Sequence, residues 1–198
     1  WKKNCSEEIL LGVSLTGIME RPLTNGKRDG IEELLEKLKD HAVATNKKWA
    51  KKLGINRATA ITCVKPSGTV SQLVDAASGI HARHNPYYIR TVRGDKKDPL
   101  TRMMVDAGFP VEDDVMNPNH TSVFSFPIKV DENSVFRTDM SAIEQLELWL
   151  VYQKYWCEHK PSVTISVKEH EWLEVGAWVY EHFDYMSGVS FLPFSDHT

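Results

Sequence analysis

The sequence has 198 residues, of which 41% are hydrophobic and 26% are charged, with a formal net charge of −3 and a pI near 6.3. Such values are ordinary for a globular protein with one sizeable core or two small ones. The weak negative charge argues against a general binder of nucleic acids or membrane surfaces. No apolar run approaches the roughly 18 residues that a membrane span needs.

Three widely spaced cysteines, Cys5, Cys63 and Cys157, form neither a zinc-binding pattern nor a disulfide framework. They predict a reducing environment, and therefore a cytoplasmic protein. The sequence begins at Trp1 rather than at a methionine, and it stops shortly after a strongly apolar run. We therefore expect residues 1–198 to form a single segment of a longer polypeptide.

The N-terminal quarter of the chain predicts two helices. Residues 9–19 carry apolar side chains on a broad face, which predicts a buried helix. A turn with the helix-breaking pairs Asn-Gly and Asp-Gly follows. Residues 31–53 then predict the clearest helix, because apolar side chains recur at helical spacing and Gly54 can end it.

The middle of the chain alternates between the two kinds of element. The pattern predicts strands at 58–64, 86–93 and 121–130, and helices at 67–79 and 98–108. Residues 111–120 predict a loop. Pro127 lies inside the third of these strands, where it suggests a sheet edge or a bulge.

The C-terminal part repeats the alternation. The pattern predicts helices at 141–157 and 168–183, and strands at 162–167 and 188–194. Strands that are separated by helices of this length favour parallel pairing, and therefore an α/β fold. The pattern alone leaves open whether the strands form a barrel or an open sheet.

The stretch KPSGTVSQ, residues 65–72, lies between a predicted strand and a predicted short helix. A helix that begins near Ser67 would offer unpaired N–H groups and the positive end of its dipole to an anion. Gly68 would let a phosphate approach the backbone, and Lys65 adds positive charge. The alternative is a helix that Ser67 merely caps, and the residues alone favour this cap. The spacing of a Walker A loop is absent.

Other polar and aromatic clusters give weaker indications. His81 and His84 lie three positions apart, but the further ligands that a metal needs are missing, so we predict no metal site. Cys157 and His159 are too close in sequence to favour a nucleophile with its base. The aromatic side chains around residues 149–180 predict a packed core, with a flat cofactor lying over one face as the alternative.

The chain resembles the monomeric adenosylcobalamin-dependent ribonucleoside-triphosphate reductases, the class II ribonucleotide reductases. The resemblance extends over essentially all of the chain and is carried by four segments: GVSLTGIM, KPSGTVSQLVDAASGIHARHNPYYIRTVRG, LELWLVYQKYWCEHKPSVTISV and EWLEVGAWVYEHFD. It implies an α/β fold in which residues 1–198 are a late part of a ten-stranded α/β barrel, with parallel strands and connecting helices.

The resemblance also implies two sets of binding residues. The substrate phosphates would lie at Pro66, Ser67, Gly68, Thr69 and Val70. The adenosylcobalamin would lie beside Gln153, Tyr155, Trp156, Cys157, Glu158, His159, Lys160, Pro161, Ser162, Val163 and Thr164.

The reaction that the resemblance implies is the radical reduction of a ribonucleoside triphosphate at its 2′-hydroxyl, by a monomeric enzyme with thioredoxin or a similar dithiol as reductant. The family's thiyl cysteine lies in an Asn-Pro-Cys-x-Glu loop, and two further cysteines supply electrons. Neither the loop nor a C-terminal cysteine pair occurs in the sequence. We therefore predict no catalytic residue here, and expect the isolated chain to be inactive. A diphosphate substrate, a non-catalytic nucleotide-binding module and a purely structural barrel wall remain alternatives.

Overall fold

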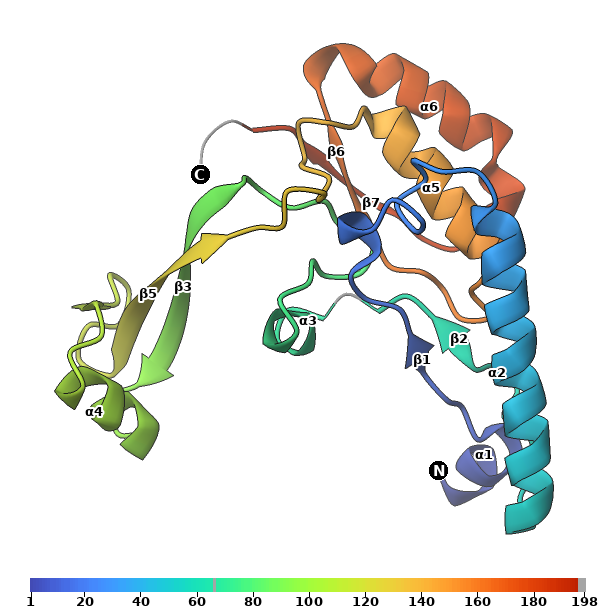
Figure 1. The fold of residues 1–198 in the computed structure, drawn as a ribbon, viewed down its shortest axis with the longest axis horizontal. Coiled ribbons are helices and arrows are strands. Elements are labelled where there is room, and N and C mark those ends of the chain that lie inside the picture. The colour runs from blue at the N-terminus through green and yellow to red at the C-terminus, as the bar shows by residue number, and fades with distance from the viewer. Residues whose placement is uncertain (66, 196–198) are drawn as a thin grey trace. The chain divides into compact units, whose positions relative to one another are not determined.

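In the computed structural model, which describes residues 1–65 and 67–195, the chain divides into two compact units (Figure 1). The first combines residues 1–83 with the chain from 133 onward, and the second covers His84–Glu132. The expectation that residues 1–198 form a single segment of a longer chain stays a prediction. Within the described residues, no helix combines the length and the apolar character that crossing a membrane requires.

The first unit mixes helices with short parallel strand pairs. Its elements are α1 (Lys2–Glu8), β1 (Val13–Ser14), the 3₁₀ helix η1 (Ile18–Glu20), α2 (Ile31–Leu53), β2 (Thr62–Cys63), α3 (Val70–Leu73), α5 (Ala142–Tyr155), β6 (Thr164–Val167), η2 (Glu169–Glu171), α6 (Trp172–Glu181), η3 (Phe183–Tyr185) and β7 (Ser190–Pro193). Strand β1 pairs with β2, and β6 pairs with β7, both in parallel. This arrangement confirms the α/β fold class.

Helix α5 is the centre of the core of the first unit. Its side chains Leu146, Trp149 and Tyr152 are fully buried, as is Ile165 of the neighbouring strand β6. The helix begins at a capping box, in which the Ser141 hydroxyl accepts from an N–H three residues on, and the Glu144 carboxylate accepts from the Ser141 N–H. Apolar burial and the hydrogen-bonded N-terminus thus both stabilise α5, whose bounds lie close to the predicted range 141–157.

The prediction of a buried helix over residues 9–19 is wrong. This segment is extended around β1, where the N–H groups of Leu11 and Val13 donate to the carbonyl oxygens of Ala60 and Ile61. Gly17 has a φ of 72°, a left-handed conformation that interrupts any helix through this point. Pairing with β2 has therefore overridden the apolar periodicity.

Helix α2 confirms its prediction, and Gly54 ends it with a φ of 68°. Ile31 and Leu35 in its first half are buried, and in its second half Ala50 is buried too. Further along, Trp49 is 46% exposed and Leu53 is 65% exposed. The second half of the helix lines an apolar groove of about 610 Å³ together with the extended residues before β1.

The second unit is a three-stranded antiparallel sheet with one helix. It comprises β3 (Tyr87–Asp95), α4 (Pro99–Asp106), β4 (Val111–Asp113) and β5 (Thr121–Lys129), in the order β3-β5-β4. The expected parallel pairing is wrong for this unit, because α4 is short and the chain simply returns along β3. The loop predicted at 111–120 also contains β4, which the sequence pattern missed.

Strand β5 is the middle strand of this sheet, although it contains Pro127. Strand β4 pairs only with residues 122–124 of β5, whereas Pro127 lies opposite Ile89 of β3. At the level of Pro127 the sheet therefore has only two strands, and β5 is locally its edge. The prediction of an edge position is confirmed at this residue, since proline cannot donate to a ladder hydrogen bond.

Candidate functional site

The candidate phosphate loop, residues 67–70, lies between β2 and the start of α3 in the first unit. Pro66, which the sequence also assigns to this loop, lies outside the described residues. Gly68, Thr69 and Val70 are exposed, and Ser67 is half-buried. Helix α3 has only four residues instead of the predicted thirteen-residue span 67–79, so its dipole contributes little and the individual N–H groups matter more.

A chain of hydroxyl groups holds the start of α3 from behind. The Ser67 Oγ accepts from the Ser71 N–H at 2.8 Å and lies 2.9 Å from the Ser71 Oγ. The Ser71 Oγ lies 2.8 Å from Thr16 Oγ1, which is 3.2 Å from the carbonyl oxygen of Ala77. A carbonyl can only accept, so Thr16 donates to Ala77, Ser71 donates to Thr16, and Ser67 donates to Ser71.

The C-terminal end of α3 is a Schellman motif. The Ala76 N–H donates to the Ser71 carbonyl, and the Asp75 N–H donates to the Gln72 carbonyl. Asp75 has a φ of 50°, which places it in the left-handed position that glycine normally takes. The one-turn helix is thus closed by backbone geometry at one end and by Ser67 at the other.

Three donors remain for a ligand at this loop. In the described part of the chain, the N–H groups of Thr69 and Val70 and the hydroxyl of Thr69 have no hydrogen-bond acceptor. All three belong to exposed residues. Such a row of N–H groups is suited to an anion with several oxygens. The loop therefore combines the cap and the anion-binding geometry that the sequence left as alternatives.

The segment predicted to contact the cofactor, residues 153–164, separates into buried and accessible side chains. Trp156, Cys157, Pro161 and Val163 belong to the core, so their side chains face the protein. The side chains that are at least partly accessible are Gln153, Tyr155, Glu158, His159, Lys160, Ser162 and Thr164.

Strand β2 connects this segment to the phosphate loop. The Glu158 carboxylate accepts from the Ile61 N–H at 2.8 Å and from the Thr62 N–H at 3.3 Å. The Trp156 indole N–H donates to the Cys63 carbonyl at 2.7 Å. Residues 153–164 are therefore fixed to the strand that leads directly into the phosphate loop.

His81 provides a second connection between the two predicted segments. Its Nε2 accepts from the Thr164 N–H at 3.1 Å, and its Nδ1 lies 2.7 Å from the Ser78 carbonyl. Because Nε2 accepts, the proton must be on Nδ1 and the ring is neutral. His81 thus links the turn after α3 to β6, a connection that the sequence did not indicate.

The three cysteines differ in exposure. Cys5 is exposed, Cys63 is partly buried and Cys157 is buried. Burial, assisted by the nearby Cys63 thiol, raises the pKa of Cys157 to about 12. Cys157 is therefore a protonated thiol at neutral pH, and the absence of a catalytic role stays a prediction.

The side-chain oxygen of Gln153 indicates whether residues 153–164 could bind a corrinoid. The Gln153 Oε1 is buried and has no hydrogen-bond partner in the described part of the chain. A corrin ring carries amide side chains, whose N–H groups are donors of the kind that this oxygen lacks. The polar side chains of the segment therefore fit such a group.

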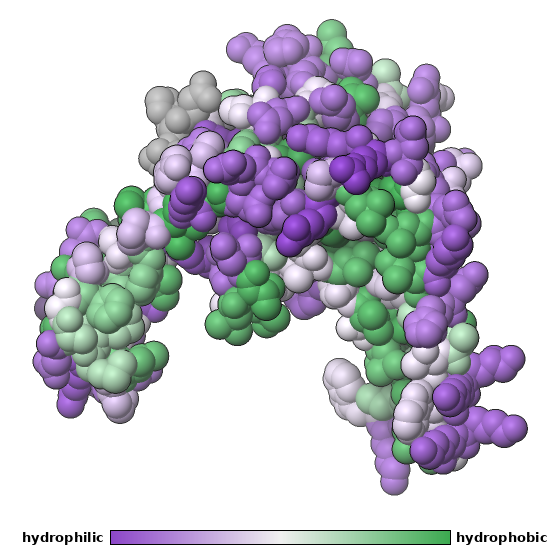
Figure 2. Space-filling view, viewed as in Figure 1, coloured by the Kyte–Doolittle hydropathy of each residue, from purple (hydrophilic) through white to green (hydrophobic). Residues whose placement is uncertain are grey.

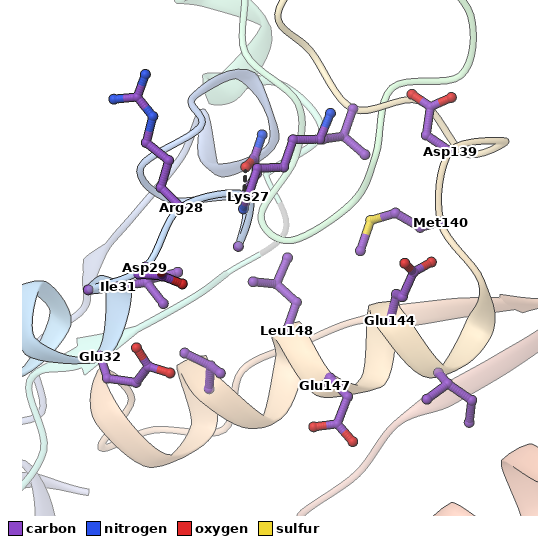
Figure 3. Close-up of a pocket in the computed structure, with 16 residues that line it drawn as sticks. Lys27, Arg28, Asp29, Ile31, Glu32, Asp139, Met140, Glu144, Glu147 and Leu148 are labelled. Carbon is purple, nitrogen blue, oxygen red and sulfur yellow. Dashed lines mark hydrogen bonds between the residues drawn. The ribbon is translucent and has the colours of Figure 1, made fainter.

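A second hollow, of about 480 Å³, lies over α5 beside the turn at residues 25–30 (Figure 3). Its apolar floor includes Leu148, and carboxylates surround it. Several of these are already engaged: Glu144 closes the capping box, Glu147 accepts from the Trp178 indole, and Asp139 accepts from the Phe136 N–H. We assign this hollow no ligand, because these carboxylates have structural partners.

The sequence missed three of the residues that hold the phosphate loop in place. Thr16 belongs to the hydroxyl chain, and Glu20 and Arg83 form a buried ion pair next to it. Two of these residues precede the loop by about fifty positions or more, so sequence spacing gave no signal. The position of Glu20 directly after the apolar Ile18 and Met19 was a weak hint.

The fold defines a class of protein. It matches the crystal structure of a B12-dependent (class II) ribonucleotide reductase with a TM-score of 0.83 and 25% sequence identity, over 100% of this chain and 31% of that chain. No protein-family model matches the sequence.

Curated proteins with similar sequences indicate a particular group within this class. An adenosylcobalamin-dependent ribonucleoside-triphosphate reductase of Euglena gracilis is 31% identical over 200 aligned residues, which cover 98% of this chain and 27% of that protein. The corresponding enzyme of Lactobacillus leichmannii is 30% identical over 82% of this chain and 22% of its own length. The chain is therefore homologous to a segment of the adenosylcobalamin-dependent ribonucleoside-triphosphate reductases, as the sequence resemblance predicted, and it spans about a quarter of their length.

Proposed function

We propose that this chain is part of an enzyme that reduces ribonucleoside triphosphates to 2′-deoxyribonucleoside triphosphates with adenosylcobalamin as cofactor. One observation carries the proposal: 98% of the chain aligns with a relative that bears this activity in its name. The structural match of the whole chain to a class II ribonucleotide reductase supports it. The alternative of a non-catalytic nucleotide-binding module is not favoured, because the relatives named for the reductase span nearly all of the chain.

Within this function, we assign the substrate phosphates to residues 66–70. The support is the row of unpaired donors at Thr69 and Val70, together with the exposed Gly68, where a phosphate can reach the backbone. Adding a Cβ at Gly68 would meet no atom within 4 Å, so the glycine serves access rather than internal packing. The cap at Ser67 keeps these donors in one orientation.

We assign the cofactor side to residues 153–164. Gln153 would hold an amide of the corrinoid through its orphaned Oε1, and the accessible side chains of Lys160 and Thr164 would border it. When bound, adenosylcobalamin supplies the radical chemistry. The contribution of this chain is to orient that group and to connect it, through β2 and His81, with the substrate loop.

The reacting cysteines would lie outside this chain. Burial of Cys157 and the partial burial of Cys63 support this assignment. We further propose thioredoxin or a similar dithiol as reductant, a monomeric enzyme and a cytoplasmic location. These proposals rest on the sequence resemblance and on the cysteine content.

The intact protein tests the proposed function directly. With adenosylcobalamin and dithiothreitol it should convert CTP to dCTP, and nucleotide addition should change the corrinoid absorbance. The isolated 198 residues should show neither activity. An intact protein that binds CTP but neither reduces it nor alters the corrinoid spectrum would instead support a nucleotide-binding module.

A further inference from the structure

A buried ion pair lies at the end of α3, the helix that follows the phosphate loop. The Glu20 Oε1 accepts from the Arg83 Nε at 2.7 Å and from the Ala77 N–H at 2.6 Å. The Arg83 side chain is 4% exposed and that of Glu20 is 9% exposed. The pair therefore sits where charge is strongly disfavoured unless each partner is satisfied.

Arg83 extends from Glu20 to the end of α3. Its Nη2 donates to the Asp75 carbonyl oxygen at 2.6 Å and lies 3.4 Å from Asp75 Oδ1. Asp75 is the left-handed residue of the Schellman motif, a conformation that costs a non-glycine residue about 1 kcal/mol. Glu20 and Arg83 thus hold the two residues, Asp75 and Ala77, that fix the direction in which α3 ends.

The backbone around both charged residues is itself fixed. The Arg83 N–H donates to the Val135 carbonyl, and the Arg83 carbonyl accepts from the Arg137 N–H. The Val135 N–H in turn donates to the carbonyl of Met19, the residue before Glu20. One short segment, residues 135–137, therefore anchors both members of the ion pair.

Apolar packing cannot do the same for α3. Its side chains Val70 and Leu73 are 64% and 85% exposed, and Val74 after it is 64% exposed. Figure 2 shows hydrophobic surface at the place where Figure 1 labels α3. A single helical turn is also unfavourable by itself, because nucleation fixes several dihedral angles for one hydrogen bond. The side chains of α3 itself therefore add little apolar packing, and polar contacts, together with the buried Ala76 and Ala77 after it, hold the N–H groups of Thr69 and Val70 in position.

We propose that Glu20 and Arg83 are positioning residues for substrate phosphates: their ion pair fixes α3, and so aims the unpaired N–H groups of residues 69 and 70. The inference rests on the proposed phosphate site. Neither side chain touches the ligand. Losing the pair should therefore weaken the recognition of phosphate more than that of the nucleoside.

The test uses the intact enzyme with Arg83→Lys, which retains the charge but cannot reach Glu20 and Asp75 together. KM for CTP and the inhibition constant of inorganic tripolyphosphate should both rise about tenfold, as expected for misplaced hydrogen bonds. The inhibition constant of cytidine, which has no phosphate, should stay within about twofold of its wild-type value. Arg93→Lys is the matched control, because Arg93 also donates through Nε to a carboxylate, at 2.8 Å, but in the other unit.

Unchanged constants in Arg83→Lys, or a parallel rise for tripolyphosphate and cytidine, would overturn the positioning role. Should Arg83→Lys fail to fold, Glu20→Gln decides, because glutamine can still accept from Arg83 Nε without the charge. A tripolyphosphate constant in Glu20→Gln equal to that of the wild type would overturn the inference, and a selective rise would support it. A wild-type enzyme that tripolyphosphate does not inhibit would instead contradict the proposed phosphate site itself.

Discussion

Helices α5 and α3 of the same unit are held in opposite ways. Helix α5 has fourteen residues, buries Leu146, Trp149 and Tyr152, and closes its N-terminus with a capping box. Helix α3 has one turn, exposes most of its apolar side chains, and depends on hydroxyl groups and one ion pair. Apolar packing stabilises α5, whereas hydrogen bonds and an ion pair, which depend on direction, fix the position of α3. The contrast separates the part of the unit that stabilises the fold from the part that presents donors.

The largest effect should come from the core of α5. Trp149→Ala should lower the free energy of unfolding by about 3–5 kcal/mol, because it leaves a large cavity and removes the indole bond to the Pro161 carbonyl. Denaturant unfolding followed by circular dichroism measures this change. Trp172→Ala is the control, since this side chain is 41% exposed and should cost less than about 1 kcal/mol. Equal losses in both variants would break the comparison.

The next effect should appear in substrate binding rather than in stability. Thr69→Val and Ser67→Ala should each raise KM for CTP about fivefold to tenfold, the equivalent of one hydrogen bond at about 1–1.4 kcal/mol. Thr69 would lose a direct donor, whereas Ser67 would lose the cap that orients the loop. Steady-state kinetics of the intact enzyme measure both. If neither variant changes KM, the loop is only a helix cap.

A smaller effect tests the Schellman motif of α3. Asp75→Ala should be less stable than Asp75→Gly by about 1 kcal/mol, because glycine adopts the left-handed conformation without a Cβ penalty. Both variants lose the contact between the carboxylate and Arg83, so their difference isolates the backbone. Thermal unfolding of the two variants gives the comparison. Equal stability would mean that residue 75 does not hold this conformation in solution.

The smallest effect concerns an ion pair outside the core. In the second unit, the hydrogen bond from Arg93 lowers the pKa of the Asp114 carboxyl below its ordinary value of 3.8. A lowered carboxyl pKa stabilises the folded state above that ordinary value, and the contribution is lost as pH falls through the folded pKa. Asp114→Asn should therefore be less stable than the wild type at neutral pH, and the two should converge below pH 3.8. Hydrogen exchange of the β3 and β5 amides follows this unit, and a difference that persists in acid would contradict the linkage.

The sequence was most informative where local signals agreed with tertiary packing. Apolar spacing, a terminal glycine or a capping serine located α2 and α5 within a few residues. It failed where long-range contacts decided. Residues 9–19 have a helical pattern, but pairing with β2 extended them, and β4 is too short to leave a pattern.

The same division applies to the candidate site. The stretch KPSGTVSQ was recognisable because its residue types suit both a cap and a phosphate. Thr16, Glu20 and Arg83, which hold it, were not recognisable because folding alone brings them to the loop. Which side chains of residues 153–164 are buried also depends on the packing of α5, and the chain alone could not specify that.

The hydroxyl chain behind the loop has a direction, and this direction restricts how a ligand can bind. Because the Ala77 carbonyl only accepts, the protons of Thr16, Ser71 and Ser67 all point inward, away from solvent. A phosphate oxygen needs a hydrogen-bond donor, whereas the Ser67 hydroxyl already donates to Ser71 and can offer only its oxygen lone pairs. The Ser67 hydroxyl can donate to a phosphate only if it rotates away from the Ser71 Oγ, and this breaks one hydrogen bond of the chain. Before any ligand binds, the loop therefore has two kinds of group: the N–H groups of residues 69 and 70 and the Thr69 hydroxyl belong to exposed residues and have no acceptor within the described chain, whereas the Ser67 hydroxyl already donates to Ser71.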